Sequence, residues 1–276
     1  MRFFRRLGGA SAFLIHVLWT ASQIHRSAAI PDKGATLGAY LKLKSKHFLT
    51  KLFPGLRFKR ETLFGYPVVF FDYFTLVCIF ETVFVYRDYC FQPATNRPFI
   101  LDCGSNIGLS VLYFKRQFPE SRVIAFEPDP DTFAALEKNA AGQGWRDVEL
   151  HNCAVYARTG EVEFHYDPEQ PGAVRNSVDG DTGPAVRRVP AVALSEFIRE
   201  EVDFLKLDVE GAEMAVLEEV ARSGKLRNIR AMAVEYHHHM VPTEDRFSEL
   251  LRLLEDNGYG YVLHDTPERP FARGQF

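Results

Sequence analysis

A glycine-containing turn that follows an apolar run carries the clearest chemistry in the sequence. The segment reads LDCGSNIG, so an aspartate, Asp102, stands directly before the turn. Gly104 permits a tight turn and close approach of a ligand to the backbone, and Gly108 opens the next helix. A dinucleotide site needs G-x-G-x-x-G, but Asn106 takes the second glycine position, and Asp102 would repel a pyrophosphate. We therefore predict a ligand that carries a cation instead of two phosphates. The residues predicted to hold it are Asp102, Gly104, Ser105, Asn106 and Gly108.

A second acidic residue follows the next apolar run. Glu127 stands twenty-five residues after Asp102, about where an acid binds ribose hydroxyls in nucleoside-binding α/β folds. Pro128 helps to shape the turn after it, whereas a plain solvated strand end is the alternative. After the third apolar run, Asn152 and Ala154 offer small or amide-bearing edges for a flat base. We predict a nucleoside site from these residues, with a weaker case for the last two.

Carboxylates and a histidine follow the two later apolar runs, in the segments LKLDVEGAE and AVEYHHHM. If the first strand persists through its acidic tripeptide, Asp208 and Glu210 point in the same direction. Paired carboxylates raise one another's pKa and supply a general base, and a histidine can accept a proton from an alcohol. We predict Asp208 or His237 as the base, with Glu210 and Glu235 orienting the substrate. Asp208 is also predicted to contact the ligand that the glycine turn holds. A helix-start role is the alternative for Glu213, and a helix cap for Asp208.

A metal site is the minor interpretation of the same residues. Glu235, one histidine, Asp208 and Glu210 would make a mixed site, but three consecutive histidines cannot all face one ion. The four cysteines show no C-x-x-C spacing and are expected to be reduced thiols, which favours the cytoplasm. A divalent metal is therefore not expected.

These residues require a sheet whose strands end at one edge. From residue 98 onward, short apolar runs alternate with helical patterns, which is typical of a parallel sheet with crossover helices. The predicted strands are 99–103, 122–127, 148–155, 204–209, 229–236 and 259–264. The predicted helices lie near 108–118, 130–142, 193–201, 211–223 and 243–257. An insertion adds β-segments at 160–167 and 187–194, and 269–276 would form a last, antiparallel strand. The expected fold class is α/β, with seven strands in a mostly parallel sheet.

Three segments are expected along the chain: a helical extension over 1–55, a β-rich lead-in over 56–97 with a short helix, and the sheet domain over 98–276. The lead-in aromatics are predicted to pack in the core, with a pocket-lining role as the alternative. The net charge of −3 argues against a nucleic-acid partner. The oligomeric state is left open.

The first 26 residues predict a helix with one apolar seam. The seam consists of Phe3, Leu7, Ala10, Leu14, Val17, Ala21 and Ile24. A packed or interfacial helix is the main expectation, and a secretory signal or an anchor is the alternative. The arginines at its start would allow peripheral contact with anionic lipid, so the expected location is cytoplasmic with membrane association as a variant.

Four motifs together resemble the FkbM-type S-adenosylmethionine-dependent methyltransferases: ILDCGSNIGLSVLYF, VIAFEPDPDTF, FLKLDVEGAE and FGYPVVFFDYFTL. The resemblance covers residues 60–264. It implies a Rossmann-like seven-stranded fold, with S-adenosylmethionine held at the 102–108 turn, its ribose at Glu127 and its adenine near 152–154. It also implies O-methylation of a hydroxyl on a small-molecule, sugar or glycan-like acceptor.

Three other functions compete with this interpretation. A nicotinamide oxidoreductase would share the topology, but the second and third glycines of its fingerprint are missing. A nucleic-acid methyltransferase would need an Asn- or Asp-Pro-Pro-aromatic segment where DVEGAE stands. The third alternative is an inactive cofactor-binding scaffold that is recruited through the N-terminal helix.

Overall fold

The computed structural model describes residues 2–169, 183–237 and 246–263. Its centre is a five-stranded sheet in the order β10-β9-β3-β4-β5, with every neighbouring pair parallel. The strands are β3 (Phe99–Cys103), β4 (Arg122–Phe126), β5 (Val148–His151), β9 (Phe204–Leu207) and β10 (Met232–Val234). Strand order reverses between β3 and β9, and in open α/β sheets a ligand binds at such a switch point.

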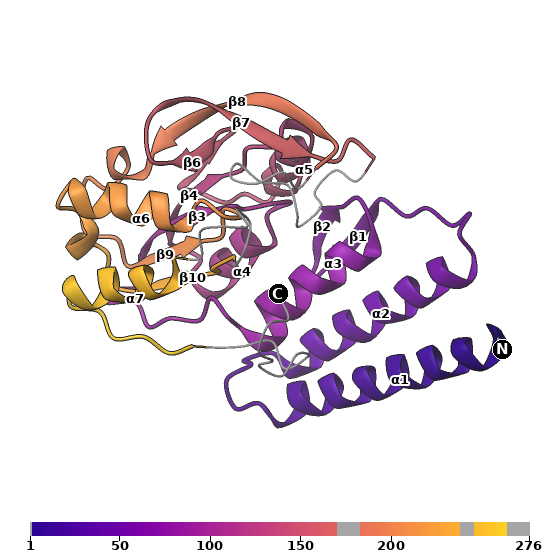
Figure 1. Cartoon of the computed structure of the whole chain (residues 1–276). Coiled ribbons are helices and arrows are strands. Elements are labelled where there is room, and N and C mark those ends of the chain that lie inside the picture. Colours follow the sequence, from indigo (N-terminus) through magenta and orange to yellow (C-terminus); the bar gives the residue numbers. More distant parts are fainter. Residues whose placement is uncertain (1, 170–182, 238–245, 264–276) are drawn as a thin grey trace.

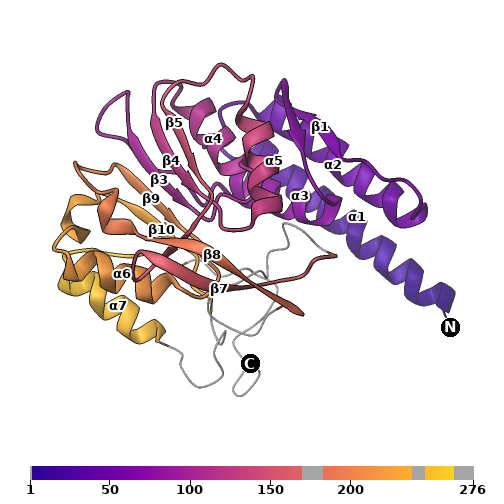
Figure 2. The ribbon, with the colours of Figure 1, turned by 90° about the horizontal axis from the view of Figure 1, so that it is seen from above.

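Helices cover both faces of this sheet (Figures 1 and 2). They are α4 (Leu109–Gln117) and α5 (Pro130–Ala140) on one face, and α6 (Glu213–Arg222) and α7 (Phe247–Asp256) on the other. Successive side chains of a strand point to opposite faces, so Ile100 joins the core under α4 and α5, while Leu101 joins the core under α6 and α7. The α/β prediction is confirmed, and both cores are built from the predicted apolar runs.

The first segment of the chain is a helical hairpin on the outside of the molecule, formed by α1 (Arg2–Arg26) and α2 (Lys33–Leu52) (Figure 1). Asp32 caps α2, since its carboxylate accepts the Ala35 N–H at 3.2 Å. The predicted α1 seam is met only in part: Ile24 is buried, but Leu14 is exposed. None of the helices in the described part of the chain combines the length and apolar character that a bilayer crossing requires.

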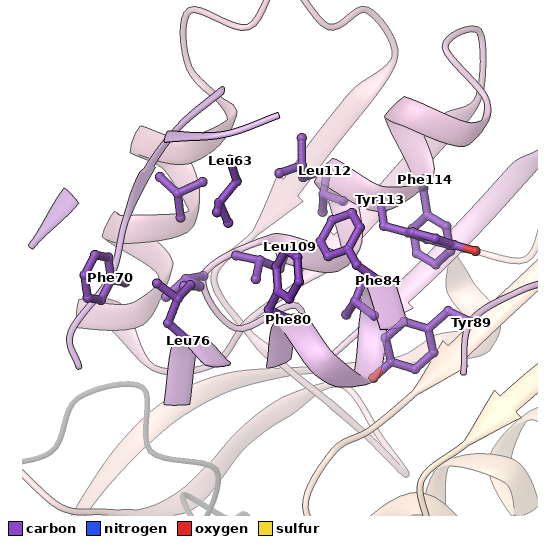
Figure 3. Close-up of a cluster of buried hydrophobic side chains, with 14 of the residues drawn as sticks. Leu63, Phe70, Leu76, Phe80, Phe84, Tyr89, Leu109, Leu112, Tyr113 and Phe114 are labelled. Carbon is purple, nitrogen blue, oxygen red and sulfur yellow. The ribbon is translucent and has the colours of Figure 1, made fainter. Parts of the chain in front are cut away.

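The lead-in joins the hairpin to the sheet. It contains the antiparallel strands β1 (Arg60–Leu63) and β2 (Tyr66–Val69), helix α3 (Tyr73–Phe80) and a π-helical turn, η1 (Glu81–Tyr86). Phe70, Phe80 and Phe84 from this segment are buried in one cluster with Tyr113 and Phe114 of α4 (Figure 3), and the Phe84 ring meets the Tyr113 ring with centroids 5.7 Å apart. These aromatics therefore pack in the core, as the sequence predicted.

A second sheet of three strands, in the order β6-β8-β7, stands beside the first. It consists of β6 (Ala154–Tyr156), β7 (Gly160–Tyr166) and β8 (Ala185–Ala193), so the predicted β-insertion is confirmed. The predicted strand 148–155 was wrong as a single strand, because the chain leaves the main sheet after His151. There the Asn152 amide donates to the carbonyls of Glu127 and Pro128, and the following residues pair with β8.

Two other predicted elements differ. Residues 193–201 hold only a short 3₁₀ turn, η2 (Leu194–Glu196). The Ser195 carbonyl there accepts the Ile198 N–H at 3.3 Å, an i→i+3 bond of the 3₁₀ type, and a hydrogen bond from the Lys225 ammonium at 2.6 Å. Residues 259–263 form no strand, since the Tyr259 hydroxyl anchors them to the Leu226 and Ile229 carbonyls. The predicted last strand, 269–276, lies outside the described residues. Within the described residues the main sheet has five strands, so the expected seven are not confirmed.

Candidate active site

One cavity of about 320 Å³ opens at the carboxyl ends of β3, β4 and β9. Its walls also come from α3 and η1 on one side and from β6 and β7 on the other. Most of the predicted site residues line it: Gly104, Ser105, Asn106, Glu127, Pro128, Ala154, Asp208, Glu210, Glu235 and His237. The three predicted residues that do not line it are Asp102, Gly108 and Asn152. The structure thus gathers the strand-end residues around one space of ligand size.

The turn after β3 has a backbone that only glycine accommodates at two positions. Gly104 has a φ of +84°, and a Cβ there would lie 1.7 Å from the Asp208 carbonyl oxygen. Gly108 has a φ of +88°, and its Cβ would lie 2.6 Å from Leu136 Cδ1. Asn106 between them is also left-handed, with a φ of +48°. The turn is therefore fixed by close backbone approach to the β9 end and by packing on α5.

Asp102 shapes this turn from below. Its side chain is fully buried, and Oδ2 accepts the Ser110 hydroxyl at 2.5 Å. Oδ1 lies 3.6 Å from the Lys206 ammonium and has no hydrogen bond. Burial raises the pKa of the Asp102 carboxyl, and the charge of Lys206 opposes that rise. Asp102 is not a lining residue, so it acts on the shape and charge beneath the cavity.

Lys206 is the functional side chain that sequence reasoning missed. It lies in the middle of β9, is 3% exposed, and donates to the Gly104 carbonyl at 2.6 Å and to Asp208 Oδ2 at 3.3 Å. Burial lowers the pKa of Lys206, but the carboxylates of Asp208 and Asp102 and the Tyr89 hydroxyl outweigh it and raise that pKa well above its usual value. A lysine within the apolar run FLKL was the available signal, because a buried strand holds an ammonium only where acids surround it.

Glu127 closes the turn from the β4 side. Its Oε2 accepts the Asn106 N–H and its Oε1 accepts the Asp129 N–H, both at 2.9 Å. Burial raises the pKa of Glu127 to about 8. A carboxylate has about four lone-pair sites, so about two remain for a ligand. Asn152 holds the backbone of Glu127 and Pro128 at 2.9 and 3.2 Å, which makes it a support for the turn.

The chain beyond β9 turns at once. The strand ends at Leu207, so Asp208 and Glu210 do not extend it, and Glu210 is left-handed with a φ of +56°. Glu213 begins α6, and its Oε1 accepts the Gly211 N–H at 3.0 Å, which fits the helix-start role. The two predicted acids still reach the cavity, because the turn carries both to its rim.

His237 lies between two glutamates. Its Nδ1 is 2.9 Å from Glu213 Oε1, and its Nε2 is 3.2 Å from Glu210 Oε2. Burial alone lowers the pKa of His237, but these two carboxylates outweigh burial and raise it to about 10. The imidazole is therefore protonated at neutral pH. His238 and His239 lie outside the described residues.

Two other carboxylates at this rim have raised pKa values. Repulsion by Asp208, together with burial, raises the pKa of Glu235 to about 7. Burial raises the pKa of Glu210 to about 8, and Asp208 adds to the rise. Groups poised near neutrality in a cleft are candidates for proton transfer.

Among the described residues, Asp208, Glu235 and His237 place ligand atoms within 4.8 Å of one another, close enough to share a metal ion. Lys206 and protonated His237 already lie against the carboxylates of this rim. Positive charge from the chain itself thus balances the acids, and metal independence stays a prediction. All four cysteines are free thiols.

Comparison with known proteins connects this site to a family. The model of the methyltransferase FkbM domain matches residues 102–261, which is more than half of the chain and includes the turn, Glu127 and the acidic rim. The protein named methyltransferase sdnD, from Sordaria araneosa, is 32% identical over 235 residues, covering 71% of this chain and 88% of that protein.

Two further relatives extend the comparison. Methyltransferase 1 of Beauveria bassiana (strain ARSEF 2860) is 31% identical over 161 residues, which are 50% of this chain and 65% of that protein, slightly under two thirds of its length. The 31-O-demethyl-FK506 methyltransferase FkbM of Streptomyces tacrolimicus is 27% identical over 68% of this chain and 84% of its own. With its glycine turn, its acids at the strand ends and its match to the family model, the chain belongs to the FkbM family of methyltransferases.

Proposed function

We propose that the protein is an S-adenosylmethionine-dependent O-methyltransferase whose acceptor is a hydroxyl group on a sugar or another small molecule. The observation that carries the proposal is the single cavity, in which a glycine turn and Glu127 face a rim of carboxylates. The names of further relatives support the acceptor class: 2-O-methyltransferase NoeI of Sinorhizobium fredii (strain NBRC 101917 / NGR234), and hexuronic acid methyltransferase AglP of Haloferax volcanii. They are 29% and 27% identical over 44% and 55% of this chain.

The residues present fit this cofactor. Gly104 lets the turn lie against the Asp208 carbonyl and lines the cavity with bare backbone, and the unused lone pairs of Glu127 suit two neighbouring ribose hydroxyls. Ala154 and Val155 give the cavity a small apolar edge where a base would lie. The acids around the cavity suit a sulfonium group and an ammonium group, and they disfavour a pyrophosphate. When bound, S-adenosylmethionine supplies a methyl group that its positive sulfur has already activated.

The chain's own residues must orient the acceptor and remove its proton. His237 is protonated at neutral pH, so it donates hydrogen bonds and cannot serve as the base. Asp208 Oδ2 is 3.3 Å from the Lys206 ammonium, so that oxygen already has a partner within the chain. Glu235, with a pKa of about 7 and a position at the exposed rim, is the better acceptor of a hydroxyl proton. We therefore assign the base to Glu235, and the orienting of the acceptor to His237 and Glu210.

Two measurements test the proposed function. Calorimetric titration should give heat with S-adenosylhomocysteine and none with NAD, and the reverse result would favour the oxidoreductase. Supplying methyl-labelled S-adenosylmethionine with a panel of hexoses, uronic acids and macrocyclic alcohols should place label on an acceptor oxygen. Cofactor binding with no transfer to any acceptor would contradict the enzyme and favour the scaffold.

A further inference from the structure

Helix α1 is apolar on its inner and its outer side. Ile24 is buried and Val17 is partly buried on the side that faces the body of the molecule. The outer side carries Leu14, Ile15, Leu18 and Trp19, which are 57, 67, 61 and 45% exposed. A surface helix ordinarily has polar residues on its outer side, and one that is apolar all round is covered by something.

Helix α2 and the residues after it extend this apolar surface. Phe13 of α1 stacks on Phe48 of α2 with ring centroids 5.4 Å apart, so the two helices present adjoining surfaces. We call the exposed apolar residues of this region the hairpin face. The hairpin face consists of Leu14, Ile15, Leu18, Trp19, Leu41, Phe48, Leu49, Leu52, Phe53 and Leu56. A patch of this kind marks a surface that binds a protein or a membrane.

The charge of the same segment indicates whether the hairpin face binds a protein or a membrane. The first 60 residues contain 12 Lys and Arg and a single acid, Asp32, whereas the remaining residues contain 21 Lys and Arg and 35 Asp and Glu. Some of the hairpin cations are neutralised by the lead-in, since Lys42 and Lys46 pair with Glu61 of β1. Lys51 and Arg57 are exposed beside the apolar residues at the end of α2. The hairpin is thus a basic surface on an acidic protein.

We propose that the hairpin face docks the protein on a bilayer surface that contains anionic phospholipids. Apolar side chains on a helix with flanking cations lie in the plane of the headgroups, and each cation near the surface adds attraction to anionic lipid. Trp19 on the outer side is a residue type enriched at this boundary. A second copy of the chain is the weaker occupant, because two hairpin faces of the same positive sign repel one another.

The docked surface lies close to the cavity. Helix α2 packs on α3, and the cavity is lined from that side by Cys78 and Ile79 of α3 and by Thr82 of η1. Helix α2 thus lies between α1 and α3 (Figure 1), and α3 carries part of the cavity wall. This interaction is independent of the chemistry proposed for the cavity.

Vesicle binding tests the proposal. The chain has two tryptophans, so Trp145→Phe leaves Trp19 as the only indole reporter. With vesicles of phosphatidylcholine and phosphatidylglycerol at about 7:3, we expect co-sedimentation and a blue shift of Trp19 emission. Vesicles of phosphatidylcholine alone should bind at least about tenfold more weakly, and about 0.5 M salt should reduce the difference.

Three full-length variants locate the contact. Leu18→Asp should weaken binding at least about tenfold, because it places a charge where an apolar side chain meets the lipid. The double variant Lys51→Glu and Arg57→Glu should remove the preference for anionic vesicles. Val186→Asp, at an exposed position on β8, is the matched control and should bind as the wild type does.

Other outcomes overturn the proposal. Wild-type protein that binds neither kind of vesicle, or both equally, would contradict anionic docking. A concentration-dependent dimer in analytical ultracentrifugation that Leu18→Asp converts to monomer would assign the hairpin face to a second copy. Circular dichroism of each variant should match the wild type, and the positions chosen are exposed, so loss of binding reports on the surface.

Discussion

The two sides of the cavity are built in different ways. On the β3 and β4 side, backbone contacts hold the residues that line the cavity: Glu127 accepts two N–H groups, and Gly104 lies against the Asp208 carbonyl. On the β9 and β10 side, the polar groups face other side chains: His237 contacts two glutamates, and Asp208 repels Glu235. The first side is fixed by backbone geometry, and the second side is set by charge.

This difference separates two tasks of one transfer reaction. A methyl donor is consumed in each turnover, so every new donor molecule needs the same cradle, and close backbone contacts supply it without reorganisation. Removing a proton from an acceptor needs a group with a pKa near the working pH, and only neighbouring charges and burial can set that value. The comparison predicts that changes on the first side alter cofactor binding, and that changes on the second side alter rate.

The largest expected effect is that of Gly104→Ala. A Cβ 1.7 Å from a backbone oxygen cannot be accommodated unless the turn moves away from β9. We expect calorimetry to detect no binding of S-adenosylhomocysteine by this variant. Gly55→Ala is the control, since a Cβ there meets nothing within 4 Å. A Gly104→Ala variant with wild-type affinity would show that the cradle is not where the cofactor lies.

The next effect is that of Glu235→Gln on the acceptor side. The amide cannot accept the hydroxyl proton, so kcat should fall by about 100- to 10,000-fold. The affinity for S-adenosylhomocysteine should stay near that of the wild type, because this residue is not part of the glycine turn. Glu200→Gln, at an exposed ion pair with Arg122, is the matched control. A loss of affinity without a loss of rate would reverse the assignment of the two sides.

A smaller effect is expected for Glu127→Gln. The amide keeps the size of the side chain but replaces one acceptor oxygen with an NH2 donor, so it cannot accept both backbone N–H groups and two ribose hydroxyls, and a buried polar group left unsatisfied costs about 1–3 kcal/mol. The dissociation constant for S-adenosylhomocysteine should rise by about 10- to 100-fold in calorimetry. The matched control is Glu120→Gln, on the exposed loop before β4. An unchanged affinity with a reduced kcat would place Glu127 on the acceptor side.

The sequence predicted the first side of the cavity better than the second. The LDCGSNIG turn and Glu127 depend on local backbone requirements, which residue types and spacing reveal. Lys206 was missed because its importance comes from the acids that β3 and the β9 turn bring around it. The pKa of His237 was equally hidden, since it depends on Glu210 and Glu213 across the turn. The residues at the strand ends could be predicted from the local sequence, whereas the balance of charges around Lys206 and His237 could be seen only in the tertiary structure.

The outer elements show the same limit. The run 148–155 has a continuous strand pattern, yet the Asn152 contacts with the β4 turn divide it between two sheets. Of the outward apolar residues of α1, Leu14 was predicted to lie in the buried seam, and Leu18 was not part of that seam, because periodicity groups residues on a face without showing what covers that face. Such features follow from neighbours that the local sequence does not contain.

The finest test of the comparison is the pH dependence of kcat/KM. A base acts in its deprotonated form, so the rate should rise with pH, level off above the Glu235 pKa of about 7, and fall about tenfold per pH unit below it. Asp208 repulsion is the main cause of that raised pKa, so Asp208→Asn should move the midpoint to lower pH, whatever its effect on the plateau. Glu235→Gln should lose the step. If the pH step survives in Glu235→Gln and disappears in His237→Gln, the histidine is the base. The carboxylates of Glu210 and Glu213 would then leave the pKa of His237 low enough for the imidazole to accept a proton.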